Sequence, residues 1–187
     1  MEGFNIFLIG VGGQGIGLLS EVILRAADHA NLRVKAVDTH GLAQRGGIVI
    51  SQIRIGEKVF SPLIAPGQAD LVLALERHEA LRGALTAIKH QGTLVYYDTV
   101  LQPLFVRLNQ AEETGNEEIA RMCVAKKVRL FRVYRKGLPD VRMQNMVVLA
   151  RVARQRLIPR VEVDHYQQAM DDLMAGEMLK ANLAVFE

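Results

Sequence analysis

The sequence of 187 residues has a single cysteine, Cys123, and no tryptophan. One cysteine excludes an intramolecular disulfide, and it also excludes a thiolate-only iron–sulfur cluster or a cysteine-rich zinc site built from this chain alone. No apolar run approaches the ~20 residues of a transmembrane helix. The first residues also lack the charged start and long apolar core of a signal peptide. These absences predict a soluble protein of the cytoplasm with no membrane partner.

Several catalytic signatures are also absent from the sequence. There is no Walker A lysine, no G-x-S-x-G elbow and no pair of histidines at metal-binding spacing. The Gly-Asp-Gly start of a thiamine-diphosphate/Mg²⁺ motif is missing as well. We therefore expect no catalytic residue and no metal ligand on this chain, and no redox reaction by the chain unaided.

Acidic residues are scarce in one part of the sequence. Between Arg121 and Arg160 there are twelve Lys and Arg residues but only one acid, Asp140. One interpretation is a solvated basic face, and the other is a docking surface for an acidic partner or a phosphorylated cofactor. A nucleic-acid partner is not expected, because few aromatic residues lie among the basic ones and no recognition motif accompanies them.

A glycine-rich segment follows the first apolar run. Residues 10–15 read Gly10-Val11-Gly12-Gly13-Gln14-Gly15, directly after the run 4–9. Gly10, Gly12 and Gly15 match G-x-G-x-x-G between a predicted strand and a predicted helix, which is the context that the dinucleotide-binding fingerprint requires. Such a turn brings backbone N–H groups close to a phosphate. The alternative is that the glycines only allow a tight junction between strand and helix.

The periodicity of apolar residues predicts one three-layer α/β domain over residues 1–187, Rossmann-like at its start. The alternating run 48–55 follows strand 33–38 without a helix of ordinary length between them, so a mostly parallel sheet should contain an antiparallel or irregular element. Further strands are expected at 70–75, 93–97 and 129–134, and helices at 14–30, from Leu81 to a stop at Gly92, at 117–126 and from Met143 onward. A last helix should begin with Asp164 as its N-cap and Gln167 as the capping partner.

A second glycine segment lies between the strands predicted at 33–38 and 48–55. It contains Gln44, Arg45, Gly46 and Gly47. Consecutive glycines relax the steric limits of the backbone, and an adjacent arginine can bind phosphate or carboxylate with two hydrogen bonds. A surface loop whose glycines serve only turn geometry is the alternative. Glu76 and Asp98, near predicted strand ends, are candidate site residues or else capping or surface acids.

Asp38 stands where the dinucleotide fingerprint places an acid for the ribose hydroxyls. This residue supports a second hypothesis, a free-standing nucleotide-binding module of the NAD type. The glycine segment is denser than that fingerprint needs, however, and no acid/base pair for hydride transfer is evident. A third hypothesis is an interaction protein whose glycine turns are purely structural.

Three ordered segments resemble a known family: Gly10–Gly15, the run 44–51 (Gln-Arg-Gly-Gly-Ile-Val-Ile-Ser) and the run 69–76 (Ala-Asp-Leu-Val-Leu-Ala-Leu-Glu). Together they resemble the gamma-type subunit or domain of 2-oxoacid:ferredoxin oxidoreductases. The form His40-Gly41-Leu42-Ala43 before Gln44 is most similar to the small (beta) subunits of the indolepyruvate type. The resemblance covers nearly the whole chain and is densest over residues 5–98.

The resemblance implies a subunit of a heteromeric enzyme that oxidatively decarboxylates 2-oxoacids to acyl-coenzyme A and passes the electrons to ferredoxin. It implies that thiamine diphosphate and the iron–sulfur clusters are held by a larger partner subunit, so this chain alone holds no cofactor. The two glycine segments should then lie together at the carboxyl edge of the sheet. There Gly10, Gly12, Gly13, Gln14, Gly15, Gln44, Arg45, Gly46 and Gly47 would face the partner and contact a phosphate of coenzyme A or thiamine diphosphate.

Overall fold

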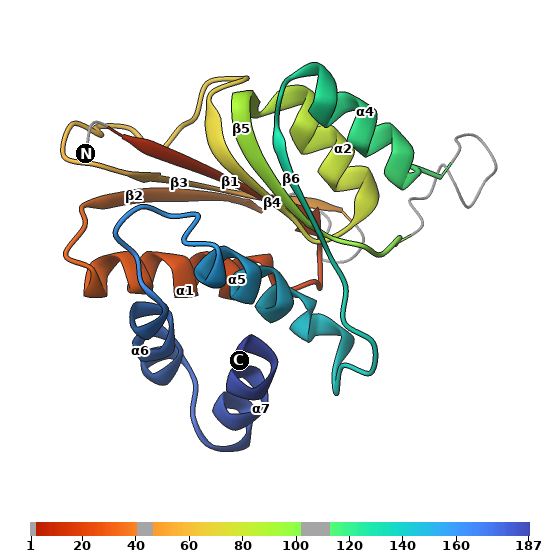
Figure 1. Cartoon of the computed structure of the whole chain (residues 1–187). Helices are drawn as coiled ribbons and strands as arrows, with labels where there is room; N and C mark the ends of the chain where they lie inside the picture. Colours follow the sequence, from red (N-terminus) through yellow and green to blue (C-terminus); the bar gives the residue numbers. More distant parts are fainter. Residues whose placement is uncertain (1–2, 41–46, 102–112) are drawn as a thin grey trace.

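A six-stranded sheet forms the centre of the protein in a computed structural model that describes residues 3–40, 47–101 and 113–187 (Figure 1). The sheet order is β2-β3-β1-β4-β5-β6. Of these six strands, β3 alone runs antiparallel to its neighbours, β1 and β2, while β1, β4, β5 and β6 pair in parallel. The strands are β1 (Phe4–Val11), β2 (Val34–His40), β3 (Ile48–Ile55), β4 (Ala69–Ala74), β5 (Ile88–Tyr97) and β6 (Arg129–Val133).

Helices cover both faces of this sheet and complete three layers (Figure 1). On one face lie α1 (Ile16–His29) and α5 (Gln144–Arg154), with α6 (Val163–Leu173) and α7 (Gly176–Phe186) packed outside them. On the other face lie α2 (Arg77–Thr86) and α4 (Asn116–Ala125). The sequence-based prediction of a three-layer, mostly parallel and partly mixed α/β fold is confirmed.

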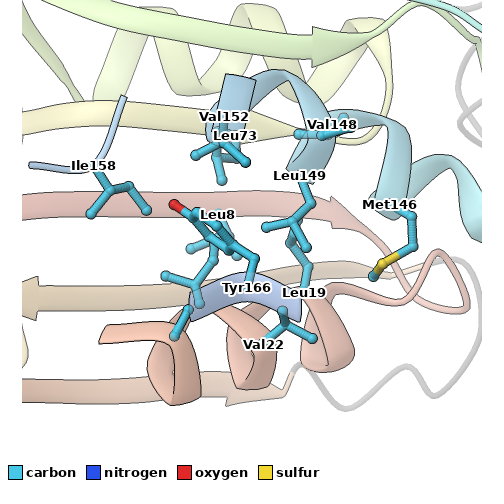
Figure 2. Packing of buried hydrophobic residues seen from close by; sticks show 14 of the residues in the cluster. Leu8, Leu19, Val22, Leu73, Met146, Val148, Leu149, Val152, Ile158 and Tyr166 are labelled. Carbon is cyan, nitrogen blue, oxygen red and sulfur yellow. The ribbon is translucent and has the colours of Figure 1, made fainter. Parts of the chain in front are cut away.

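The larger core lies between the sheet and α1, α5 and α6 (Figure 2). Apolar residues spaced at three and four positions put one face of α1 against the sheet, which is the pattern of an amphipathic helix. Tyr166 of α6 is fully buried in this core, and burial raises the pKa of its phenol. The buried side chains labelled in the close-up are Leu8, Leu19, Val22, Leu73, Met146, Val148, Leu149, Val152, Ile158 and Tyr166.

The helix predicted to run from Leu81 to Gly92 ends earlier than expected. α2 ends at Thr86, and Gly92 lies inside β5. A Cβ atom on Gly92 would lie 2.8 Å from Cγ1 of Ile88 and 3.2 Å from the carbonyl oxygen of Ala69, beside an irregularity in the β4–β5 pairing. Gly92 therefore permits a close approach of two strands instead of ending a helix.

The C-terminal segment forms two helices where the sequence predicted one. The N-cap of α6 is Glu162, whose partner in the capping box is His165, so the prediction of Asp164 and Gln167 is wrong. Asp164 lies in the first turn of α6, where an acid interacts favourably with the helix dipole. The chain is extended at Met174, and Gly176, with φ +57°, begins α7. Within the described residues, no helix is long and apolar enough to cross a membrane.

Candidate functional site

The two glycine segments meet at the carboxyl edge of β1. The N–H of Gly12 donates to the carbonyl oxygen of Gly47 at 2.9 Å. The antiparallel register continues this contact, with Val11 opposite Ile48. The predicted proximity is thus present at Gly47, whereas Gln44, Arg45 and Gly46 lie outside the described residues.

Packing explains two of the glycines in the turn. A Cβ atom on Gly10 would lie 2.9 Å from Oε1 of Gln14 and 3.0 Å from Cδ1 of Ile16. Gly15 has φ +80°, and a Cβ atom there would lie 2.5 Å from Nδ2 of Asn145 in α5. Asn145 is buried and donates to the carbonyl oxygen of Gly15 at 3.1 Å. These two glycines therefore let the turn fit beneath its own helix and α5.

Gln14 fastens the turn to the neighbouring strand. Its side chain is 3% exposed. Its Oε1 accepts from the N–H of Val11 at 2.7 Å, and its Nε2 donates to the carbonyl oxygen of Leu75, directly after β4, at 2.8 Å. The side chain of Gln14 thus joins β1 to β4 and positions the turn.

Gly13 is the exposed part of the turn. It has φ +99°, and no heavy atom would lie within 4 Å of a Cβ atom built on it. The turn leads directly into α1, whose first amides have no partner within the helix because a helix leaves its first four N–H groups unpaired. Backbone is therefore accessible at Gly13, beside the positive end of the α1 dipole.

Glu76 follows β4 at the same edge of the sheet. It is fully buried and caps α2, where its Oε1 accepts from the N–H of Glu79 at 2.5 Å. Its other carboxylate oxygen, Oε2, is buried without a hydrogen-bond partner among the described residues. Burial raises the pKa of Glu76 to about 7, against the opposing effect of the backbone amides of Glu79 and His78. The capping alternative for this acid is therefore confirmed.

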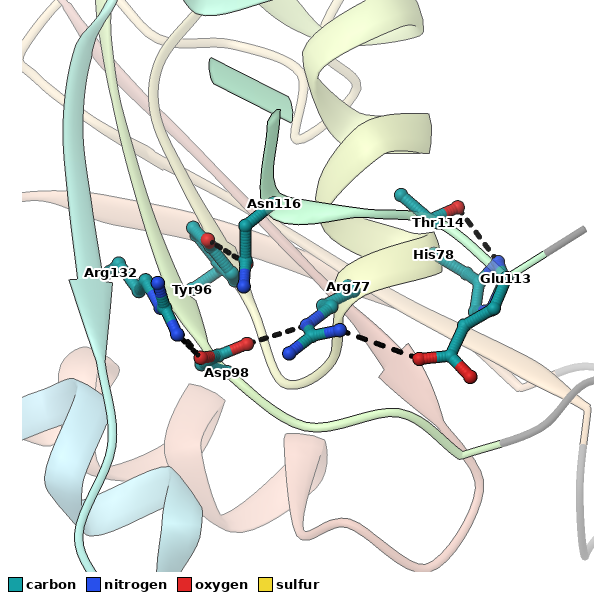
Figure 3. Close-up of polar contacts among 8 residues, drawn as sticks. All are labelled: Arg77, His78, Tyr96, Asp98, Glu113, Thr114, Asn116 and Arg132. Atoms are coloured by element: carbon teal, nitrogen blue, oxygen red, sulfur yellow. Dashed lines mark hydrogen bonds and ion pairs between the residues drawn. The ribbon is translucent and has the colours of Figure 1, made fainter. Parts of the chain in front are cut away.

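Asp98 follows β5 and anchors a polar cluster (Figure 3). Its carboxylate accepts from Nε of Arg77 at 2.5 Å and from Nε of Arg132 at 2.6 Å. Burial alone would raise the pKa of Asp98, but the hydrogen bonds from these two guanidinium groups hold it below its ordinary value. Asp98 is therefore an ionised anchor that joins β5, β6 and the start of α2.

The remaining contacts of the cluster join α2 to Thr114, which precedes α4, and join β5 to Asn116, the first residue of α4 (Figure 3). Nδ1 of His78 lies 2.9 Å from the hydroxyl of Thr114, and the Tyr96 hydroxyl hydrogen-bonds to the side-chain amide of Asn116. Nε2 of His78 is buried without a hydrogen-bond partner among the described residues, and burial lowers the pKa of this histidine. A neutral imidazole at neutral pH follows from this burial.

Three of the basic residues between positions 121 and 160 bind the ends of helices. Arg135 donates to the carbonyl oxygens of Ala184 and Val185, and Arg154 to those of Phe186 and Glu187, so both bind the C-terminal end of α7. Lys126 donates to the carbonyl oxygens of Ala84 and Leu85 at the end of α2. Cationic side chains at helix C-termini satisfy unpaired carbonyls and interact favourably with the helix dipole.

Asp38 is separated from the glycine turn by an additional strand. β3 lies between β1 and β2, so Asp38 at the outer strand is about 10 Å from the line of β1, which is two strand spacings. In the dinucleotide fold, strand two lies directly beside strand one. The topology therefore removes the support that Asp38 gave to the NAD hypothesis.

Metal-ligand chemistry is not apparent in the part of the chain that the structure describes. Residues 3–40, 47–101 and 113–187 contain no group of three or more His, Cys, Asp or Glu side chains arranged to hold a metal ion. Cys123 lies buried in α4, and burial raises the pKa of its thiol to about 11. One buried thiol does not fit an iron–sulfur cluster, which requires several thiolates.

The fold and the carboxyl edge of the sheet define the class of protein: a mixed α/β domain with a glycine turn at the carboxyl end of its first strand. Residues 5–187 match the family model described as pyruvate ferredoxin/flavodoxin oxidoreductase. The chain belongs to this family.

The similarity to known proteins extends over nearly the whole chain. It is 35% identical over 96% of its length to the indolepyruvate oxidoreductase subunit IorB of Archaeoglobus fulgidus, covering 90% of that protein. It is 34% identical over 98% of its length to the subunit of the same name in Methanothermobacter thermautotrophicus, covering 94% of it. The fold resembles the pyruvate oxidoreductase subunit PORC from Thermotoga maritima, with TM-score 0.66, 16% identity and coverage of 100% of this chain and 94% of that one.

Family membership and these relatives identify the chain as a subunit of a heteromeric 2-oxoacid ferredoxin oxidoreductase of the indolepyruvate type. The resemblance found in the three sequence motifs is thereby confirmed.

Proposed function

We propose that the carboxyl edge of this subunit forms one wall of an active site that it shares with a larger partner subunit. The partner would carry thiamine diphosphate and the iron–sulfur clusters, and the complex would act on an aryl-substituted 2-oxoacid such as indolepyruvate. The 2-oxoacid would lose CO₂, its acyl group would join coenzyme A, and the released electron pair would pass to ferredoxin. This chain would then act in the cytoplasm as one domain over residues 1–187.

The observation that carries this proposal is the contact between Gly12 and Gly47. It supports a single surface made of both glycine segments, beside the ends of β1 and β4. The exposed backbone at Gly13 and the first amides of α1 suit a phosphate of coenzyme A or of thiamine diphosphate. Within the turn we assign the phosphate contact to Gly13, while Gly10, Gly12, Gly15 and Gln14 shape and position the turn. Gln44, Arg45, Gly46 and Gly47 would complete the same wall from the second glycine segment.

The chemistry of the iron–sulfur clusters and of thiamine diphosphate is assigned to the partner. The buried thiol of Cys123 supports this assignment for the clusters. The residues of this chain would exclude water and hold the phosphate, while the bound thiamine diphosphate supplies carbanion stabilisation during decarboxylation.

Reconstitution tests the proposal. The purified chain, the larger subunit and their mixture are assayed for ferredoxin reduction with indolepyruvate and coenzyme A. We expect activity only in the mixture, together with a stable complex on size-exclusion chromatography. Activity of the chain alone, or the absence of a complex, would refute the proposal.

A matched glycine pair tests the turn. Gly13→Ala forces a side chain onto backbone with φ +99°, whereas Gly17→Ala places one in open space on α1. We expect Gly13→Ala to raise the KM for coenzyme A or the Kd for thiamine diphosphate at least tenfold in the complex. Gly17→Ala should leave both unchanged, and equal effects of the two variants would contradict a phosphate contact at the turn.

A further inference from the structure

A cleft of about 280 Å³ opens beside the carboxyl ends of β5 and β6. Figure 1 shows the chain leaving β6 and returning to the start of α5, and the cleft lies along this path. Its walls include Tyr97, Tyr134, Leu138, Val141 and Gln144. The volume is below the ~300 Å³ at which pockets for drug-sized ligands begin. A single small ring system is therefore the largest rigid group that we expect it to enclose.

Two tyrosine rings form one wall of the cleft. Their centroids are 5.8 Å apart with an interplanar angle of 40°. Tyr97 is 5% exposed, and its hydroxyl donates to the carbonyl oxygen of Arg135 at 3.0 Å, so its ring is held in place. Tyr134 is 64% exposed and can therefore offer ring surface to a ligand. Aromatic pairs favour tilted or offset arrangements, and a third ring would extend this pair.

Gln144 gives the cleft a polar group without a partner. It is the first residue of α5 and is only 7% exposed, and its side-chain amide makes no hydrogen bond with the described residues. The polar atoms of this amide are not among the fully buried ones, so they are reachable from the cleft that Gln144 lines. An amide supplies both donors and an acceptor, so a ligand with either group on its edge would satisfy it.

The charge of the cleft separates neutral from anionic ligands. Arg135 also lines it, but its guanidinium donates to the carbonyl oxygens of Ala184 and Val185 at the end of α7. The guanidinium of Arg135 is thus already hydrogen-bonded to the end of α7. Stacking and a neutral amide remain, and these recognise a ring in preference to a phosphate or carboxylate.

We propose that this cleft binds a neutral, planar aromatic heterocycle that stacks on Tyr134 and hydrogen-bonds to Gln144. The start of α5 connects the cleft to the glycine turn, because Gln144 lines the cleft and the next residue, Asn145, donates to the carbonyl oxygen of Gly15. Two sources of such a ring rest on the proposed function: the indole of the 2-oxoacid and the adenine of coenzyme A. The cleft itself does not depend on that function.

Direct binding to the purified full-length chain tests the inference. The probes are indole, adenosine and cyclohexanol, each titrated at millimolar concentration and followed by ligand-observed NMR. We expect at least one of the two heterocycles to bind and cyclohexanol to bind at least tenfold more weakly. Tyr134→Ala and Gln144→Leu should each weaken the binding at least fivefold, with Tyr134→Ala keeping the fold because that ring is exposed.

Two matched variants serve as controls. Phe60→Ala removes an exposed ring on the β3–β4 connection, and Gln168→Ala removes an exposed amide on α6. Both should leave the binding unchanged. Binding of neither heterocycle, equal binding of cyclohexanol, or equal affinity of Tyr134→Ala and the controls would overturn the inference.

The two heterocycles distinguish the two sources of the ring. Stronger binding of indole assigns the cleft to the substrate, and stronger binding of adenosine assigns it to the cofactor. An active reconstituted complex whose small subunit binds neither ring would refute the cleft and leave the proposed function intact. Ring binding by a chain that gives no active complex would refute the function and leave the cleft intact.

Discussion

The buried carboxyl group of Glu76 should make the stability of the protein depend on pH. Burial raises its pKa to about 7 in the folded protein, from 4.5. The folded state therefore binds more protons than the unfolded state between these two values, and stability falls as the pH rises through this window. With about 1.4 kcal/mol per pKa unit, this residue should lower the free energy of unfolding by about 2.5 kcal/mol between pH 5 and pH 8.

Glu76→Gln isolates this contribution. The amide keeps an oxygen that can accept from the N–H of Glu79, but it does not titrate. His78 has a lowered pKa and so contributes with the opposite sign, so the informative quantity is the difference between variant and parent at each pH. Urea unfolding at pH 5, 6, 7 and 8 should show Glu76→Gln gaining about 2.5 kcal/mol relative to the parent across this range.

A surface variant provides the control for this experiment. Glu21 is exposed on α1, so Glu21→Gln should show no comparable gain with pH. Parallel pH profiles for Glu76→Gln and the parent would refute the reasoning. Such a result would mean that the Glu76 carboxyl is hydrated in solution or contacts a group that stabilises its charge.

Three further predictions concern buried positions. Gln14→Leu leaves the part-buried N–H of Val11 and the buried carbonyl oxygen of Leu75 without their side-chain partner, and it should lower the free energy of unfolding by about 2 kcal/mol, measured by urea denaturation; a loss below about 1 kcal/mol would show that Gln14 does not hold β1 and β4 together. Iodoacetamide at pH 8 should label Cys123 at least tenfold faster in denaturant than in the native protein, because burial raises its pKa to about 11; equal rates would show an accessible thiolate. Gly83→Ala should lower the thermal midpoint because its Cβ would lie 2.7 Å from Cγ1 of Val72, while Gly17→Ala should not; a higher midpoint for both would refute the packing argument.

Apolar periodicity predicted where strands and helices lie better than it predicted which strands pair with each other. The alternation over 48–55 correctly indicated a strand that breaks the parallel pattern. It did not indicate that β3 lies between β1 and β2, because alternation specifies the faces of a strand and not its partners. The helix stop at Gly92 was wrong for a related reason, since a glycine can mark either a helix end or a close approach of two strands.

The candidate site also depends on long-range contacts that local sequence patterns do not specify. The glycines were evident from the sequence, but their partners lie far along the chain: Gln14 bonds to Leu75, and Gly15 to Asn145. The burial of Glu76 and the position of Gln144 in the wall of the cleft result from tertiary packing, which no local sequence pattern indicates. Spacing predicted which backbone turns tightly, whereas tertiary packing decided which polar groups were left without partners.

The structure changes the meaning of the glycine turn itself. In a dinucleotide-binding fold the turn amides are available to a pyrophosphate. Here β3 lies beside β1, and the carbonyl oxygen of Gly47 accepts a hydrogen bond from the N–H of Gly12. Gly10 and Gly15 are required by packing, so Gly13 is the turn glycine that offers open backbone. Because most of the turn is hydrogen-bonded or packed within its own subunit, it offers a small contact and not a complete nucleotide site. We therefore assign to it one wall of a site that a partner completes.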